Sequence, residues 1–398
     1  MDKLIPSKLG KLKIICSLPL FSDSICIKKQ SAAEHGYTQI ILSIILAPHL
    51  NLSLNDQCEL IELSIFAELP KTLLGDPSYY LRQNHPEVKQ IYDNIRGKIW
   101  KETELSLGLE TTRSGTLFGL HELIDSYSSM LYIEKECLLG NQFFSAERNK
   151  TFYHKKRNLA LAGEDLFKPH PCSINASHNS NKNSTHKKNS TIQINWKDAI
   201  HLLDKIFDEA NRGRLENGIL GYSSTFLGMV EKLKEHYRYK GWSYHFPESV
   251  GEHTFQVVFL CRLLATKLNL PKKLRIQLYH AAALHDLAEA YASDVIYPIK
   301  LREKEVEKIH KNIEKNIIKD ICKRFCLSWP SDPYILAIVD ICDRFSSQIY
   351  FDREFRSGNT HFNVPNSSME IVRDFYQKDF PEIFHALDNL WLEYVSSL

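Results

Sequence analysis

The sequence predicts an all-α protein, and three observations lead to that prediction. Several long segments carry apolar residues at helical spacing, strand-like alternation is rare, and residues 274–291 are rich in Ala and Leu without Gly or Pro. The chain has 398 residues, 43% of them apolar, which is enough for two or three domains with a core in each. Its formal net charge of +2 gives no bulk attraction to nucleic acid or to a membrane surface.

The predicted helices follow one another along the chain. Two apolar runs, 14–21 and 41–50, are too short to span a bilayer, and the second has the length of a core helix. Ser249 and Glu252 form a capping-box pattern, which places His253 in the first turn of a helix. Further helices are predicted at residues 196–211, 274–291, 303–325, 335–351 and 380–398.

A change in composition predicts a division of the chain. Residues 169–195 are mostly Asn, Ser, Thr, Lys and His and have little to bury, which is typical of a flexible linker. We therefore expect one domain at residues 1–168 and a second at 196–398. The first predicted helix of the second domain, 196–211, is amphipathic and could pack across both domains.

Histidines and acids in the second domain form a pattern that suits one metal ion. His285 and Asp286 are adjacent, Glu289 follows one helical turn later, His253 begins an earlier helix, and Asp343 interrupts an apolar helix. A buried histidine alone is more often just hydrogen-bonded to its neighbours, but packing does not explain the whole set. Imidazole and carboxylate ligands together suit Mn, Fe, Co, Ni or Zn better than Ca.

These residues resemble the HD-domain metal-dependent phosphohydrolases, and most closely the bacterial YfbR-type 5'-deoxynucleotidases. The resemblance covers about Phe226 to Phe362. One match is the segment SVGEHTFQV (249–257), in which the serine lies one residue further from the Glu-His pair than in the family pattern. Others are His285-Asp286-x-x-Glu289 followed by Asp294, and the segment DVIYPIK (294–300). The remaining matches are Asp343 followed by Gly358-Asn359, and Arg238 upstream of His253. Two other HD branches fit less well, because the chain has Glu289-Ala290 where one branch carries Glu-Asp, and no Gly-Tyr-Pro follows its His-Asp pair as in the other.

The resemblance implies a role for each matching residue. The metal ligands would be His253, His285, Asp286 and Asp343. Glu289 would position the attacking water or move a proton, Arg238 would clamp the phosphate with Lys300 as additional charge, and Asp294 would contact the sugar or the reacting phosphate. Tyr239 stands where these relatives carry a tryptophan that helps to exclude the ribose 2'-hydroxyl, so the resemblance leaves the choice between ribose and deoxyribose open.

The chain also repeats itself at an offset of 218 residues. Glu34-His35 matches Glu252-His253, Asp76 matches Asp294, Asp125 matches Asp343, and Gly140-Asn141 matches Gly358-Asn359. The first copy has lost much of the chemistry, with Ala67, Glu68, Lys71 and Leu20 at the positions of His285, Asp286, Glu289 and Arg238. We expect two HD-type helical bundles in tandem, the first degenerate, with a weak residual metal site as the alternative. A hypothesis from the repeat alone is that the two copies pair within the chain.

The predicted function is removal of phosphate from a nucleotide, with a 5'-(deoxy)nucleoside monophosphate as the expected substrate and no nucleic acid polymer as partner. Two alternatives stay open: a deoxynucleoside triphosphate triphosphohydrolase, and a non-catalytic protein that senses nucleotides or binds a partner. Nine scattered cysteines without a CxxC pair or a secretory signal predict reduced thiols and a cytoplasmic location.

Overall fold

The computed structural model describes residues 7–20, 26–75, 85–107, 115–141, 158, 194–223, 225–239, 241–292, 304–327, 329–362 and 367–396. These residues form helices and no strand, which confirms the all-α prediction; the extended pairings among them are isolated bridges, Pro19–Ser31 and Tyr237–Ser249. Within the same ranges, no helix combines the length and apolar character needed to cross a membrane. The predicted linker lies outside the described residues except for its last two.

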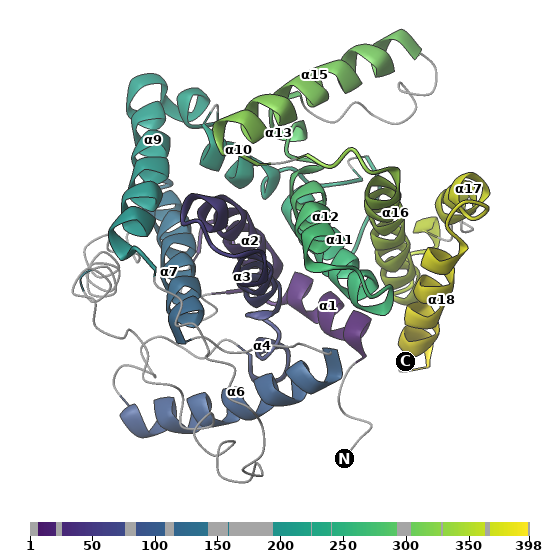
Figure 1. Cartoon of the computed structure of the whole chain (residues 1–398), viewed down its shortest axis with the longest axis horizontal. Helices are drawn as coiled ribbons and strands as arrows, with labels where there is room; N and C mark the ends of the chain where they lie inside the picture. Colours follow the sequence, from purple (N-terminus) through teal and green to yellow (C-terminus); the bar gives the residue numbers. More distant parts are fainter. Residues whose placement is uncertain are drawn as a thin grey trace.

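The helices fall into two groups along the chain (Figure 1). The first half contains α1 (Lys8–Ser17), α2 (Ala32–His49), α3 (Leu54–Phe66), α4 (Lys71–Leu74), α6 (Pro86–Leu107) and α7 (Gly115–Leu138). The second contains α9 (Trp196–Ser223), α10 (Phe226–Leu233), α11 (Val250–Lys267), α12 (Lys272–Leu284), α13 (Glu289–Ala292), α15 (Lys304–Arg324), α16 (Pro333–Arg356), the short 3₁₀-helix η3 (Thr360–Phe362), α17 (Ser367–Tyr376) and α18 (Pro381–Val395).

The helix boundaries follow the same 218-residue offset as the sequence repeat. Helix α11 begins and ends 218 residues after α2, and the same holds for α12 after α3, α13 after α4 and α16 after α7. The turns agree as well, because Asn51 and Asn269 both follow their helix with a φ of 51°. The two halves therefore share one order of helices as well as a set of matching residues.

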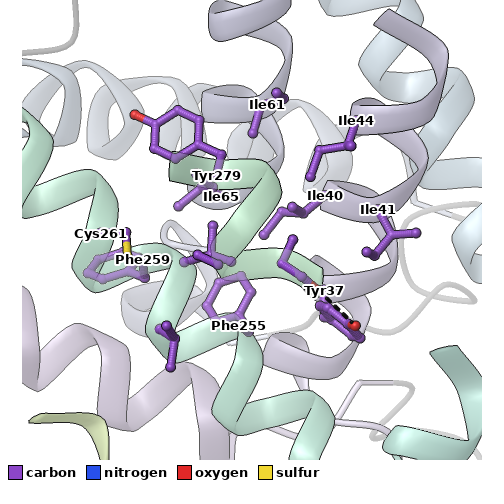
Figure 2. Packing of buried hydrophobic residues seen from close by; sticks show 14 of the residues in the cluster. Tyr37, Ile40, Ile41, Ile44, Ile61, Ile65, Phe255, Phe259, Cys261 and Tyr279 are labelled. Atoms are coloured by element: carbon purple, nitrogen blue, oxygen red, sulfur yellow. Dashed lines mark hydrogen bonds between the residues drawn. The ribbon is translucent and has the colours of Figure 1, made fainter. Parts of the chain in front are cut away.

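Helix α2 packs against α11 at the centre of the molecule, and both belong to one continuous hydrophobic core (Figure 2). The ring of Phe255 lies over Gly36, where an added Cβ would come within 2.6 Å of the ring. Phe66 of α3 meets Phe259 edge-on, with ring centroids 5.7 Å apart. This apolar contact joins the two halves without an intervening layer.

Buried polar contacts cross the same boundary. Tyr279 of α12 donates to Glu62 of α3 at 2.8 Å, and Nε of Arg262 lies 2.8 Å from the same carboxylate oxygen. Arg262 is almost fully buried, so its charge needs this partner. Glu62 therefore compensates a buried charge of the other half.

Helix α9 is longer than predicted and contacts both halves. It runs from Trp196 to Ser223 instead of ending near residue 211, and it packs on α10. Its Asp204 accepts a hydrogen bond from Tyr127 of α7 at 2.5 Å, and its Phe207 meets the same tyrosine ring edge-on. The helix predicted at 303–325 is present as α15, and that at 380–398 as α18.

The prediction of one continuous helix over residues 274–291 is wrong. Helix α12 ends at Leu284, and α13 begins only at Glu289. Between them, Leu287 and Glu289 donate to carbonyls three residues back instead of four, which tightens the chain into turns. The break lets the adjacent His285 and Asp286 approach the same neighbours, which a straight helix would not allow.

Candidate metal centre

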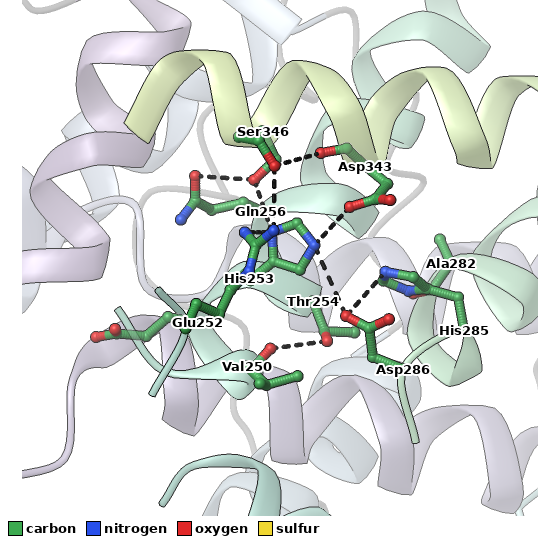
Figure 3. Close-up of polar contacts among 12 residues, drawn as sticks. Val250, Glu252, His253, Thr254, Gln256, Ala282, His285, Asp286, Asp343 and Ser346 are labelled. Atoms are coloured by element: carbon green, nitrogen blue, oxygen red, sulfur yellow. Dashed lines mark hydrogen bonds and ion pairs between the residues drawn. The ribbon is translucent and has the colours of Figure 1, made fainter. Parts of the chain in front are cut away.

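Three segments bring the four predicted metal ligands together (Figure 3). His253 comes from the first turn of α11, His285 and Asp286 from the turn after α12, and Asp343 from the middle of α16. Ligand atoms of His253, His285 and Asp343 all lie within 4.8 Å of one another. Asp286 stands outside that group of three, but its Oδ2 is 3.2 Å from Nε2 of His285 and 3.7 Å from Nε2 of His253.

Local hydrogen bonds fix the orientation of His253. The predicted capping box is present: the Ser249 hydroxyl accepts from the Glu252 N–H at 3.1 Å, and the Glu252 carboxylate accepts from the Ser249 N–H at 2.9 Å. This cap places His253 in the first turn of α11. Its Nδ1 contacts Oγ of Ser346 at 3.1 Å, and its Nε2 lies 2.8 Å from Oδ1 of Asp343. Such a contact at Nδ1 holds Nε2 toward the carboxylates.

His285 offers a buried nitrogen suited to a cation. Its Nδ1 lies 2.7 Å from the carbonyl oxygen of Ala282, which makes Nδ1 the donor and turns Nε2 toward the cluster. Nε2 is buried and makes no hydrogen bond of normal geometry, although Asp286 is near. A buried nitrogen left without a proper partner is costly unless a ligand completes its shell.

The charges around His285 also favour a cation. Burial lowers the pKa of His285, but the carboxylates of Asp286 and Asp343 outweigh it and raise that pKa to about 10. Burial raises the pKa of Asp343, and the contact with His253 more than reverses this, so that carboxyl stays ionised. Two ionised carboxylates and two imidazoles at one buried place fit a divalent ion of the Mn, Fe, Co, Ni or Zn class.

Arg238 lies directly beside the cluster. Its NH1 group is 2.5 Å from Nδ1 of His253 and donates to Oε2 of Glu248 at 3.0 Å, while NH2 donates to the Ser347 hydroxyl at 3.1 Å. Burial alone would lower the pKa of Arg238. The nearby acidic groups outweigh burial and raise that pKa above its usual value, so the guanidinium stays charged. A fixed cation next to a predicted metal-ligand histidine is well placed to bind an anion.

Tyr239 is held in an uncommon backbone conformation. Its φ is 57°, in the left-handed region that residues other than Gly seldom occupy. The ring stacks on Tyr350 with centroids 4.8 Å apart, and its hydroxyl is buried without a hydrogen bond of normal geometry. Trp242 contacts Phe362, as Tyr239 does, but it is 47% exposed and has a different position from Tyr239.

The other predicted site residues differ in what the structure says of them. Glu289 opens α13, is half-buried, and donates its backbone N–H to the Asp286 carbonyl at 2.9 Å. Asp294 and Lys300 lie outside the described residues. Sequence reasoning missed Glu248 and the serines at 346 and 347, although Ser346-Ser347 does match Ser128-Ser129 at the 218-residue offset.

A comparison with known protein families gives a match in the second half of the chain. Residues 225–384 match the model of a family described as 5'-deoxynucleotidase YfbR-like. No curated protein matches the chain. The matched segment contains all four predicted metal ligands together with Arg238, Tyr239 and Glu289. Residues 225–384 are therefore similar to a family of hydrolases, and they hold the cluster described above.

Proposed function

We propose that residues 196–398 form a metal-dependent phosphohydrolase that releases phosphate from a 5'-nucleoside monophosphate. The convergence of His253, His285 and Asp343, with Arg238 against His253, carries this proposal. The similarity of residues 225–384 to the YfbR-like 5'-deoxynucleotidases supports it independently. A cation-binding cluster and a permanent positive charge side by side suit a substrate with a compact dianionic group.

His253, His285, Asp286 and Asp343 would hold the divalent ion. When bound there, the ion supplies Lewis acidity toward a phosphate oxygen and eases deprotonation of water. Ser346 keeps the His253 ring in place, and the Ala282 carbonyl does the same for His285. Both histidines therefore have Nε2 on the side of the carboxylates, where the ion would bind.

Arg238 and Glu289 would act on the substrate and on water. The Arg238 guanidinium donates two hydrogen bonds to the phosphate, in exchange for its contact with His253. The Glu289 carboxylate accepts the proton of the attacking water, one turn away from Asp286. The bond from phosphorus to the nucleoside oxygen breaks, and that oxygen is protonated as it leaves. From the resemblance, Asp294 would contact the sugar or the reacting phosphate and Lys300 would add positive charge; both lie outside the described residues.

We propose that Tyr239 helps to choose the sugar. Its ring stacks on Tyr350, and the guanidinium of the proposed phosphate-binding Arg238 lies over the same ring, 4.9 Å from its centroid. A buried hydroxyl can accept or donate a hydrogen bond, so it can tolerate a ribose 2'-hydroxyl. We therefore expect both ribose and deoxyribose monophosphates to be accepted.

We further propose that residues 1–168 are a degenerate HD copy that pairs with the second copy inside the chain. Contacts recur at the 218-residue offset: Glu136 accepts from the Ile27 and Lys28 N–H groups, as Glu354 does from His245 and Phe246. The first copy carries Leu20 in place of the arginine and Ala67 in place of a ligand histidine. Catalysis is therefore assigned to the second copy alone.

The test is phosphate release from the purified protein. Nucleoside mono- and triphosphates of both sugars are offered with Mn, Co, Ni, Zn or Mg, beside an Asp286→Ala control. Activity on monophosphates that disappears in the control is the expected result. Release of tripolyphosphate, scored separately, would instead identify a triphosphohydrolase. Inactivity on every nucleotide, with metal bound in elemental analysis, would overturn the proposal in favour of a sensing or partner-binding protein.

A further inference from the structure

A second cluster of ligand-type side chains lies in the first half of the chain. Ligand atoms of His35 (α2), Glu68 (after α3) and Asp125 (α7) lie within 4.8 Å of one another. Nε2 of His35 is 2.8 Å from Oδ1 of Asp125, the same separation as between His253 and Asp343. Ser128 contacts Nδ1 of His35 at 3.0 Å, as Ser346 contacts His253. The framework that orients a metal ligand is thus retained here.

A lysine contacts one member of this second cluster. Nζ of Lys71 is 2.6 Å from Oε2 of Glu68, and the Glu68 side chain is almost completely buried. Lys71 stands at the position that Glu289 has in the second half, and Glu68 at that of Asp286. An ammonium group this close compensates the charge of a buried carboxylate directly.

Two further differences between the halves also add a hydrogen-bond donor or a positive charge near the first-half cluster. Gln39 donates from Nε2 to Oδ1 of Asp125 at 2.7 Å, whereas Val257 at the matching position has no donor. Arg96 of α6 lies 3.7 Å from Glu122 of α7, and an acid, Glu314, matches Arg96 in the second half. At three positions the first copy therefore carries a donor or a cation where the second copy carries neither.

We propose that His35, Glu68 and Asp125 form a cation site whose occupant is the chain's own Lys71 ammonium, and that removing this ammonium converts the cluster into a divalent-metal site. The metal would be of the class that imidazole and carboxylate ligands prefer, such as Mn or Co. The lysine fixes the charge balance of the first copy and leaves it independent of metal. The first half then folds and pairs whether or not metal is present, while the second half binds the ion.

The proposal predicts how stability responds to loss of the lysine. Lys71→Met keeps the apolar length of the side chain but leaves Glu68 without its cation, so the metal-free variant unfolds at a lower temperature than the parent. Added Mn²⁺ binds only the folded state and raises that temperature again. The parent protein lacks this second, first-half response to Mn²⁺.

The experiment counts Mn²⁺ ions per chain by equilibrium dialysis and elemental analysis. A His285→Ala/Asp286→Ala background removes the second-half site, so any ion that remains belongs to the first half. With Lys71 present, this background should bind no ion. With Lys71→Met it should bind one, and adding His35→Ala should remove it. Lys71→Arg, which keeps the positive charge, is the matched control and should bind none.

Two results would overturn the proposal. One is an ion that the background already holds with Lys71 in place and loses with His35→Ala. The other is a folded Lys71→Met variant that takes up no Mn²⁺. If Lys71→Met does not fold without metal, Mn²⁺ must restore its folding, as judged by circular dichroism. Failure of Mn²⁺ to do so in both Lys71→Met and Lys71→Gln also counts against the proposal.

Discussion

The Ser249 hydroxyl donates a hydrogen bond to Oε1 of Glu34 at 2.8 Å, across 215 residues of sequence. Ser249 caps α11, and Glu34 accepts from the Ser31 N–H at 3.0 Å as part of the cap of α2. The first turns of the two central helices are therefore joined by their own capping groups. This bond also brings two buried acids, Glu34 and Glu252, close enough to influence each other.

The pair of buried acids predicts how stability depends on pH. Burial raises the pKa of Glu34 above 4.5, although the hydrogen bond from Ser249 and the charge of Lys234 partly oppose this shift. Burial together with the Glu34 charge raises the pKa of Glu252. The native state thus holds protons that the unfolded chain loses near pH 4.5, so the free energy of unfolding falls as pH rises through the raised pKa values. In Glu34→Gln this fall should be smaller.

Urea denaturation at pH 5 and pH 8 measures that difference. The change in unfolding free energy between the two pH values is compared for the parent, Glu34→Gln and Glu370→Gln, whose side chain is exposed on α17. The exposed control should behave like the parent. An equal pH dependence in all three proteins would show that the buried pair does not titrate as argued.

Gly36→Ala should weaken the contact between α2 and α11. The new Cβ would meet the buried Phe255 ring at 2.6 Å, and overpacking of this kind costs about 1–3 kcal/mol. Gly115→Ala is the control, because a Cβ added at that position would meet no atom within 4 Å. Denaturation midpoints measure both, and Phe255→Leu should recover part of the loss in Gly36→Ala.

Arg238→Lys should impair phosphate binding although it keeps the positive charge. A lysine cannot donate in the planar fork that reaches Glu248 and Ser347 here, so kcat/KM for a monophosphate should fall on the order of a hundredfold. Arg356→Lys, at an exposed ion pair with Asp352, should leave kinetics unchanged. Equal activity in the two variants would remove Arg238 from the proposed phosphate site.

Glu289→Gln should separate chemistry from metal binding. The amide cannot take a proton from water, so kcat should fall by about 10²–10⁴-fold while the bound metal is retained. Glu305→Gln, an exposed change on α15, serves as the control. The proposed role is contradicted by full activity, and loss of the metal would make Glu289 a ligand instead.

Much of the site could be predicted because its signals are local. The spacing of Ser249 and Glu252 is enough to predict the start of α11. The adjacent His285 and Asp286 are recognisable because they interrupt a run of apolar residues. The break after Leu284 could not be predicted, since Ala and Leu favour a helix and only tertiary contacts select the turn. The hydrogen-bond partners of Arg238 could not be predicted either, because Ser347 is 109 residues away in sequence and contacts Arg238 only in the folded chain.

The tandem order of the chain has a genetic consequence for Lys71. In a dimer of identical chains, any substitution appears in both subunits, so a lysine that fills one cluster would spoil the other at the same time. Here the two clusters are encoded by separate codons. A mutation at position 71 changes the first-half cluster alone. The first half can therefore acquire a fixed lysine while position 289 in the second half keeps its glutamate.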